Sequence, residues 1–146
     1  NYVVDENVRF IEEDAIEANT MESITIPSTV IGINYPIIRN ASVLTEITTP
    51  LFNTGLADYF NRTPELLTKV ELISGDVYSN SFDGINTLTE VKINDECELE
   101  YHSGLFGDNL LTRLTIPYIT SEDNNRTLND IVEEAFIEEF SRLVTN

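Results

Sequence analysis

The sequence predicts a solenoid, a stack of short repeats in which each repeat adds one strand to a parallel sheet of about five strands. The first observation is a pattern that occurs three times, as LLTKVEL at 66–72, TLTEVKI at 87–93 and LLTRLTI at 110–116. The second is an apolar anchor residue that recurs at intervals of 23, 23, 21 and 23 residues. The third is another apolar ladder with nearly the same period. The five anchors are Met21, Leu44, Leu67, Leu88 and Leu111.

A short strand is expected directly after each anchor. Apolar residues stand three and five positions after the anchor, as at Val70 and Leu72, and polar residues alternate with them. Side chains on a strand point to opposite faces with a period of two, so one face is buried and the other is exposed. The one polar residue at these buried positions is Thr49, and Thr also follows the anchor in four of the five repeats. Stacked strands of this kind share one continuous core.

The return path of each repeat, predicted to be a loop or a short helix, carries the second ladder. Its members recur every 22 to 24 residues, and we expect them to fill the core from the convex side. Pro27, Pro50 and Pro117 fall directly after a strand, where a missing N–H ends sheet pairing. The second ladder consists of Ile16, Ile38, Phe60, Phe82 and Phe106.

The two ends of the array differ from its middle. Residues 8–21 resemble the second half of a repeat, so a strand is expected upstream, at Tyr2–Val4. Residues 120–130 are polar and break the period, which predicts an inserted loop. Apolar residues at helical spacing then predict a terminal helix over 131–144 that covers the end of the core. The alternative is that Ala135-Phe136 begins one more repeat.

The whole chain, residues 1–146, is interpreted as a single repeat domain. It starts at Asn1 without Met and without a basic segment followed by an apolar one, so we expect no signal peptide and a processed product or part of a longer chain. With 26 acidic and 8 basic residues the formal net charge is −18, which disfavours nucleic acid and anionic membranes as partners. No apolar run approaches the roughly 18 residues of a membrane span, so no membrane insertion is predicted.

Outward-facing positions of the five strands form two columns with alternating charge. Adjacent strands lie about 4.8 Å apart, so opposite charges in neighbouring repeats are expected to pair. Three acidic and three basic residues make the strip neutral. The pairs could serve stability alone, or the strip could be a protein-contact face. The first column is Ser23, Glu46, Lys69, Glu90 and Arg113, and the second is Thr25, Thr48, Glu71, Lys92 and Thr115.

Catalytic and metal chemistry find little support in the sequence. His102 is the single histidine and lies five residues from Cys97, which is also the single cysteine, and no third group is indicated that would orient such a pair. Acidic clusters at 95–100 and 12–14 could supply oxygen ligands for calcium, but neither has a known calcium-loop spacing. We therefore predict no enzyme activity, no cofactor, no metal site and no internal disulfide.

The repeats resemble a specific family, the BspA-like leucine-rich repeats. Val8–Val30 (VRFIEEDAIEANTMESITIPSTV) is similar to the family pattern, in which a valine, an isoleucine and an alanine-phenylalanine pair precede Leu-Thr-x-Ile-x-Ile-Pro. Ala15-Ile16 and Ala135-Phe136 match the pair, and Ser23–Pro27 and Arg113–Pro117 match the strand. The resemblance implies a leucine-rich-repeat solenoid of the horseshoe type, with a concave parallel sheet and an irregular convex side.

The resemblance also sets the functional expectation, because such arrays commonly belong to secreted or cell-surface proteins that adhere to or bind other proteins. We expect an extracellular or surface-exposed module that binds another protein through the concave face of its sheet. The alternative is a rigid structural component of a larger assembly, such as a virion or a surface layer, which contacts its neighbours through its ends and convex loops.

Overall fold

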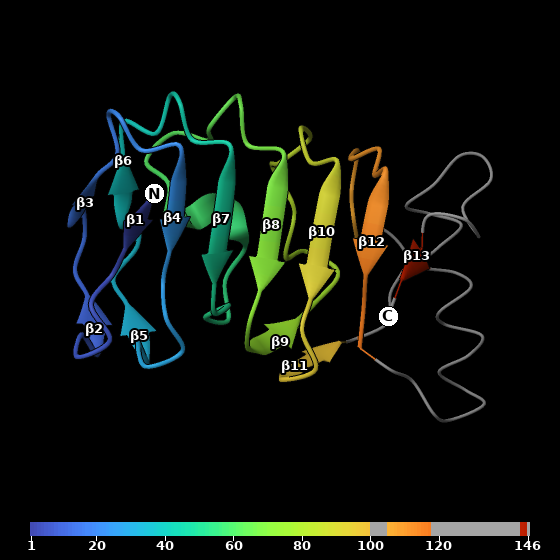
Figure 1. Ribbon diagram of the computed structural model, residues 1–146, viewed down its shortest axis with the longest axis horizontal. Coiled ribbons are helices and arrows are strands. Elements are labelled where there is room, and N and C mark those ends of the chain that lie inside the picture. Colours follow the sequence, from blue (N-terminus) through green and yellow to red (C-terminus); the bar gives the residue numbers. More distant parts are fainter. Residues whose placement is uncertain (100–104, 118–143, 146) are drawn as a thin grey trace.

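Strands from successive turns of the chain lie side by side in one parallel sheet of seven strands (Figure 1). The computed structural model describes residues 1–99, 105–117 and 144–145. Within these ranges the chain forms a parallel β-solenoid of about five turns, which confirms the predicted solenoid. In spatial order the strands of this long sheet are β1 (Tyr2–Val3), β4 (Ser23–Thr25), β7 (Glu46–Thr49), β8 (Lys69–Leu72), β10 (Glu90–Ile93), β12 (Arg113–Thr115) and β13 (Val144–Thr145).

The register of the long sheet follows the repeat alignment. Ile47 of β7 pairs with Ile24 on one side and Val70 on the other, and Val91 pairs with Val70 and Leu114 in the same way. All five side chains are buried and form one row through the core. The repeat from Leu67 to Leu88, which is two residues shorter than the others, keeps this register. Its return path is therefore the part that is shorter.

The other sides of the solenoid are made of shorter pieces. Three parallel pairs of strands lie there, and the only helix in the described ranges is the four-residue 3-10 helix η1 (Leu56–Tyr59). The return path is therefore mostly strand and turn, with little of the helix that a horseshoe fold of the α/β type would carry. The pairs are β2 (Phe10–Ile11) with β5 (Gly32–Ile33), β3 (Ile16–Glu17) with β6 (Ile38–Arg39), and β9 (Gly75–Val77) with β11 (Cys97–Leu99).

The second apolar ladder fills the core from the side opposite the long sheet, as predicted. Ile16 pairs with Ile38, and Ile38 forms an isolated parallel bridge with Phe60. The rings of Phe82 and Phe106 stack with their centroids 5.7 Å apart. All five side chains are buried. Burial of apolar area in two facing rows is the main stabilising term of this fold.

Thr49, the polar residue at a buried strand position, has its own partner in the core. Its hydroxyl donates to the Pro50 carbonyl oxygen at 2.7 Å, and the Tyr59 hydroxyl donates to the same oxygen at 2.6 Å. Burial raises the pKa of Tyr59, which keeps this hydroxyl protonated. A buried hydroxyl with a partner carries no large desolvation cost, so the polar residue is tolerated.

The two ends of the chain bear on the predicted caps. The expected upstream strand is present as β1, which pairs with β4. The predicted loop at 120–130 and most of the predicted helix at 131–144 lie outside the described residues. Val144, the last position of that predicted helix, instead belongs to β13, which pairs in parallel with β12. No helix among the described residues is long and apolar enough to cross a membrane.

Candidate protein-binding face

The two predicted columns lie together on the outer face of the long sheet, and we call these ten residues the outer strip. They are positioned by the alternation of the strands, because each buried apolar residue forces its neighbours outward. Five of the strands, from β4 to β12, contribute two residues each. The members are Ser23, Glu46, Lys69, Glu90, Arg113, Thr25, Thr48, Glu71, Lys92 and Thr115.

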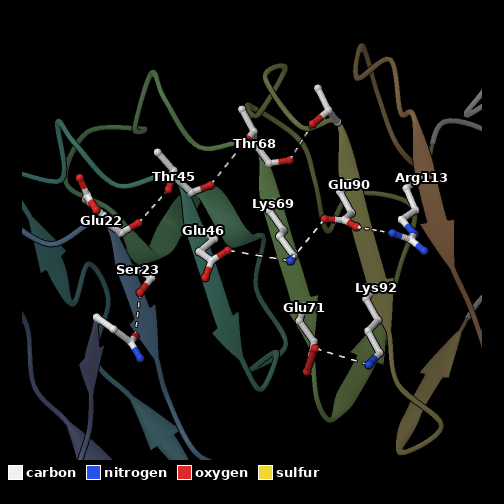
Figure 2. Close-up of polar contacts among 12 residues, drawn as sticks. Glu22, Ser23, Thr45, Glu46, Thr68, Lys69, Glu71, Glu90, Lys92 and Arg113 are labelled. Atoms are coloured by element: carbon white, nitrogen blue, oxygen red, sulfur yellow. Dashed lines mark hydrogen bonds and ion pairs between the residues drawn. The ribbon is translucent and has the colours of Figure 1, made fainter.

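Opposite charges meet across neighbouring strands in the first column (Figure 2). The Lys69 ammonium lies 4.0 Å from a Glu46 carboxylate oxygen and 3.4 Å from a Glu90 oxygen. The other Glu90 oxygen lies 3.7 Å from the Arg113 guanidinium. Four residues of one column thus form a chain of alternating sign, as the sequence predicted.

The second column carries one ion pair with threonine on each side. Lys92 lies 3.6 Å from a Glu71 carboxylate oxygen. The register places Thr48 beside Glu71, and Thr115 beside Lys92. The exchange of Lys and Glu between the second and third copies of the sequence pattern therefore produces pairs of opposite charge in both columns.

The charged groups of the strip remain accessible to a partner. The Lys69, Lys92 and Glu46 side chains are each 51% exposed, and Arg113 is 63% exposed. Exposed ion pairs contribute only about 0.2–1 kcal/mol each, because water and salt screen them. The pairs therefore add little to the free energy of unfolding, and stability alone gives a weak reason for so regular a pattern.

At the N-terminal end of the strip the contact between turns is a hydrogen bond between neutral side chains. The Ser23 hydroxyl donates to the Asn1 side-chain oxygen at 2.7 Å, so the N-terminal residue lies beside this end of the strip. No charged side chain of β1 extends the alternation, because β1 consists of Tyr2 and Val3, both exposed. The charged part of the strip therefore runs from β7 to β12.

A ladder of threonines borders the strip, and sequence reasoning gave it no role. The Thr45 carbonyl oxygen accepts from the Thr68 N–H at 2.9 Å, from the Lys69 N–H at 3.1 Å and from the Thr68 hydroxyl at 3.4 Å. The same arrangement recurs at each step of the ladder, and Figure 2 shows the hydroxyl contacts of the steps at Thr45 and Thr68. The hydroxyls of Thr45, Thr68, Thr89 and Thr112 donate to the carbonyl oxygens of Glu22, Thr45, Thr68 and Thr89.

This threonine ladder accounts for the Thr that follows the anchor in four repeats. The carbonyl oxygen that precedes each strand already accepts from two N–H groups of the next turn. The threonine hydroxyl of that next turn is a third donor to the same oxygen. The recurrence of Thr at one position was the available signal. Its meaning depends on the turn geometry, which brings one turn's hydroxyl to the carbonyl of the turn before.

Asn109 is a second residue whose role the sequence did not indicate. Its side chain is buried, and its amide group donates to the Ile85 carbonyl at 2.7 Å and to the Phe106 carbonyl at 2.8 Å. Its side-chain oxygen accepts from the Leu88 N–H at 2.8 Å. One amide therefore joins two successive turns. The equivalent residue one turn earlier, Asn86, is exposed, so the recurrence of Asn two positions before the anchor does not identify which copy is buried.

Cys97 is placed as a structural residue. Its side chain is buried, and its Sγ donates to the Leu72 carbonyl oxygen at 3.3 Å. Burial, as the largest cause, raises the pKa of the thiol to about 11. Such a thiol is a poor nucleophile at neutral pH. His102, its suggested partner, lies outside the described residues.

The acidic clusters considered for calcium are arranged without a shared centre where the structure describes them. Within residues 1–99, 105–117 and 144–145, no group of three or more His, Cys, Asp or Glu side chains could hold a metal ion. The Glu12 carboxylate instead accepts from the Asn34 side chain of the next turn at 2.6 Å. Glu100, part of one cluster, falls outside the described ranges.

Comparison with models of known protein families, with curated proteins and with solved structures gives no match to this chain. The functional interpretation therefore depends on the geometry of the outer strip and on the repeat pattern.

Proposed function

We propose that the chain is a non-enzymatic protein-binding module that recognises its partner through the outer strip. The observation that carries this function is the chain of alternating charges from Glu46 to Arg113, which the parallel sheet holds in register and in which Glu46, Lys69 and Arg113 are at least half exposed. Solenoid sheets offer extended, rigid surfaces of this kind to partners. The partner is another protein, and neither a cofactor nor a metal ion takes part.

The charge balance of the strip supports a role in recognition. Three of the eight basic residues of the chain gather there with only three of its 26 acidic residues. A neutral strip within a strongly acidic surface accepts a protein partner without the long-range repulsion that the rest of the surface exerts on acidic proteins. Alternating fixed charges also specify the register in which a partner docks.

The repeat type and location belong to the same proposal. The pattern quoted for Val8–Val30 and Arg113–Pro117 supports a leucine-rich repeat of the BspA-like type. Arrays of that type commonly stand on cell surfaces or are secreted, so we infer an extracellular or surface-exposed adhesion module. A terminal cap formed by the residues that directly precede Val144 is also part of this proposal.

A capture experiment tests the proposed function. The chain serves as bait for extracellular host proteins and for a lysate of its own source organism, and captured proteins are identified by mass spectrometry. The test variant is Lys69→Glu/Lys92→Glu. The matched control is Arg9→Glu/Arg62→Glu, which makes the same change in net charge at two exposed arginines outside the strip.

The two variants give opposite expectations. A foreign protein that binds wild type and the arginine control but not the lysine variant supports the outer strip, provided that circular dichroism shows the lysine variant folded. Equal capture by all three chains, or loss with both variants, would falsify recognition through the strip.

A structural role in a larger assembly is the second candidate, and the N-terminal edge favours it. Among the described strands β1 ends the long sheet and pairs with β4 alone, and it exposes Tyr2 and Val3. Exposed edge strands readily pair with other chains. In that case the bait captures structural proteins of its own organism, and substitution of Val3 by Pro rather than of the lysines removes the capture.

A further inference from the structure

A second surface of the solenoid, away from the outer strip, has a break in its strand pairing. On the side that follows the long sheet, β2 pairs with β5, and two turns later β9 pairs with β11. The turn between them, which follows β7, contributes no strand there. In Figure 1 the chain after β7 turns back in a tight loop that carries no strand arrow.

The hydrogen bonds show to which neighbour this middle turn is attached. The Leu51 N–H donates to the Ser74 carbonyl at 2.8 Å, and the Leu56 N–H donates to the Ser81 carbonyl at 2.8 Å. Both bonds lead to the following turn. The preceding turn donates to this part of the chain at two places, from the Ile26 N–H to Thr48 and from the Ile37 N–H to Tyr59. Between these two residues, at 27–36, no backbone bond to the middle turn is present among the described residues.

One edge of the break is β5, whose free backbone groups belong to Ile33. Gly32 donates to the Arg9 carbonyl at 3.3 Å and Asn34 to the Ile11 carbonyl at 2.9 Å, so both face β2. Residues of a strand alternate in the direction of their N–H and C=O groups, so those of Ile33 point to the opposite side. Within the described ranges no group bonds to them. They form an unpaired edge, the kind that takes up an added strand.

A cavity lies at this edge. Its volume is about 440 Å³, and it is lined by residues of β5, of the segment after β7 and of β9. Ile31 at its rim is 65% exposed, although it is a large aliphatic side chain. The lining also includes Ile33, Phe52, Asn53, Gly75 and Asp76.

The middle turn leaves the edge of β5 uncovered. β5 and β9 belong to alternate turns, and both line the cavity together with the segment after β7. The middle turn does not fill this place as a strand: Asn53 has a φ of 47°, which breaks an extended path, and η1 then starts at Leu56. Gly75 is in contact with the Leu51 carbonyl, so the middle turn is held towards β9 and away from β5.

We propose that this cavity binds an extended segment of a partner protein, which adds to β5 as a strand through the N–H and C=O groups of Ile33. Apolar side chains of the segment pack on Ile31 and Phe52, and a Lys or Arg side chain pairs with Asp76. The charge of the partner follows from that carboxylate and from the net charge of −18. This site is independent of the outer strip.

A second copy of the chain is the rival occupant. Its own charge of −18 opposes that pairing, because two strongly acidic chains repel each other and Asp76 adds a carboxylate at the cavity. Sedimentation of wild type and of Ile31→Ser at several concentrations tests it. Self-association that is lost in Ile31→Ser would assign the cavity to a second copy and overturn the peptide site.

The probe for the peptide site is a phage library of random linear decapeptides, selected on the whole chain. Enriched peptides are synthesised and their affinities measured for wild type, Ile31→Ser and Asp76→Asn. The matched control is Leu110→Ser, another aliphatic residue that is 61% exposed and does not line the cavity. We expect peptides with at least one Lys or Arg, affinity reduced at least tenfold by each cavity variant, and no change in the control.

Amide hydrogen exchange tests strand addition directly. In the free protein the Ile33 amide should exchange much faster than the amides of Gly32 and Asn34, which have acceptors. Saturation with a selected peptide should slow exchange at Ile33 at least tenfold. Failure to enrich any peptide, equal binding to all variants, or unchanged exchange at Ile33 would overturn the added strand.

Discussion

Single polar side chains join neighbouring turns of this solenoid, and Asn109 does so with the most contacts. Its amide satisfies two carbonyl groups and one N–H group, all in positions where water has little access. An unpaired buried donor or acceptor costs about 1–3 kcal/mol. The loss of Asn109 therefore affects several backbone groups at once.

Substitution of Asn109 by Ala should lower the free energy of unfolding by roughly 2–4 kcal/mol, because the Leu88 N–H and the Ile85 carbonyl lose their partner. Urea denaturation followed by circular dichroism measures it. The control is Asn86→Ala, an exposed residue at the equivalent place one turn earlier, which should change stability by less than about 0.5 kcal/mol. Equal small effects of the two substitutions would contradict the role given to Asn109.

The Cys97 thiol should resist alkylation in the folded protein. Its pKa of about 11, against an ordinary 9.0, lowers the thiolate fraction at pH 8 by roughly two orders of magnitude, and burial restricts access further. The rate of reaction with iodoacetamide should be at least tenfold lower in buffer than in urea. Similar rates in both would show that the thiol is exposed or activated.

The raised pKa also has a defined effect on stability. The folded protein holds the thiol proton more tightly than the unfolded chain, so the contribution of Cys97 is fully present below the unfolded value. It falls as pH rises from about 9 towards the folded value of about 11. The variant Cys97→Ala should lack this component of the alkaline loss of stability.

At the scale of elements, the strands are held in register by their buried rows, and the outer strip follows from that register. The Glu71–Lys92 pair is suited to a test, because its lateral neighbours are both threonines. Lys92→Glu alone places two carboxylates side by side and should cost about 1 kcal/mol at low salt. The exchange Glu71→Lys/Lys92→Glu should restore the stability. Thermal unfolding at low and high salt checks both, and no recovery in the exchanged variant would show that the pair does not act through charge.

The strands could be predicted because they depend on two periods that are visible in the order of apolar residues, namely the alternation along each strand and the spacing of the anchors. The alternation around Val70 determined which residues face outward, and the spacing of the anchors determined which strands are neighbours. The pairing of Lys69 with Glu90 followed without further information. The Leu-Thr recurrence was visible too, but the contact of each hydroxyl depends on turn geometry that no local pattern encodes.

The break in the side sheet could not be predicted in this way. Nothing in the apolar pattern distinguishes the turn after β7 from its neighbours until Asn53 adopts a positive φ and η1 replaces a strand. Asn109 and Asn86 are likewise the same residue at equivalent positions with opposite environments. Such differences arise from tertiary contacts between turns, and an alignment of the repeats does not contain these contacts.

At the scale of the whole molecule, net charge acts against the compact state. With 26 acidic and 8 basic residues, self-repulsion is distributed over the surface, whereas the ion pairs of the outer strip are few. Raising NaCl from roughly 0.02 to 0.3 M should therefore raise the melting temperature by several degrees, since screening relieves more repulsion than it removes attraction. A melting temperature that stays constant or falls would mean that the paired charges dominate.

The solenoid also separates its two proposed surfaces. The outer strip lies on the long sheet, and the cavity at β5 lies on the side that follows it, so each can be altered without the other. Variants of Ile31 should leave recognition through the strip unchanged, and exchange of Glu71 with Lys92 should leave peptide binding unchanged. The two sites are therefore tested by independent sets of variants.

The most direct test of the outer strip is the dissociation constant of the captured partner for wild type and for Glu71→Lys/Lys92→Glu, measured by isothermal titration calorimetry. The exchanged variant has the composition, net charge and ion pair of the wild type, and only the order of the two charges on the sheet differs. Recognition through the strip predicts binding at least tenfold weaker at an unchanged melting temperature. Equal affinity of the two chains would contradict it and leave the alternating charges as a purely structural feature.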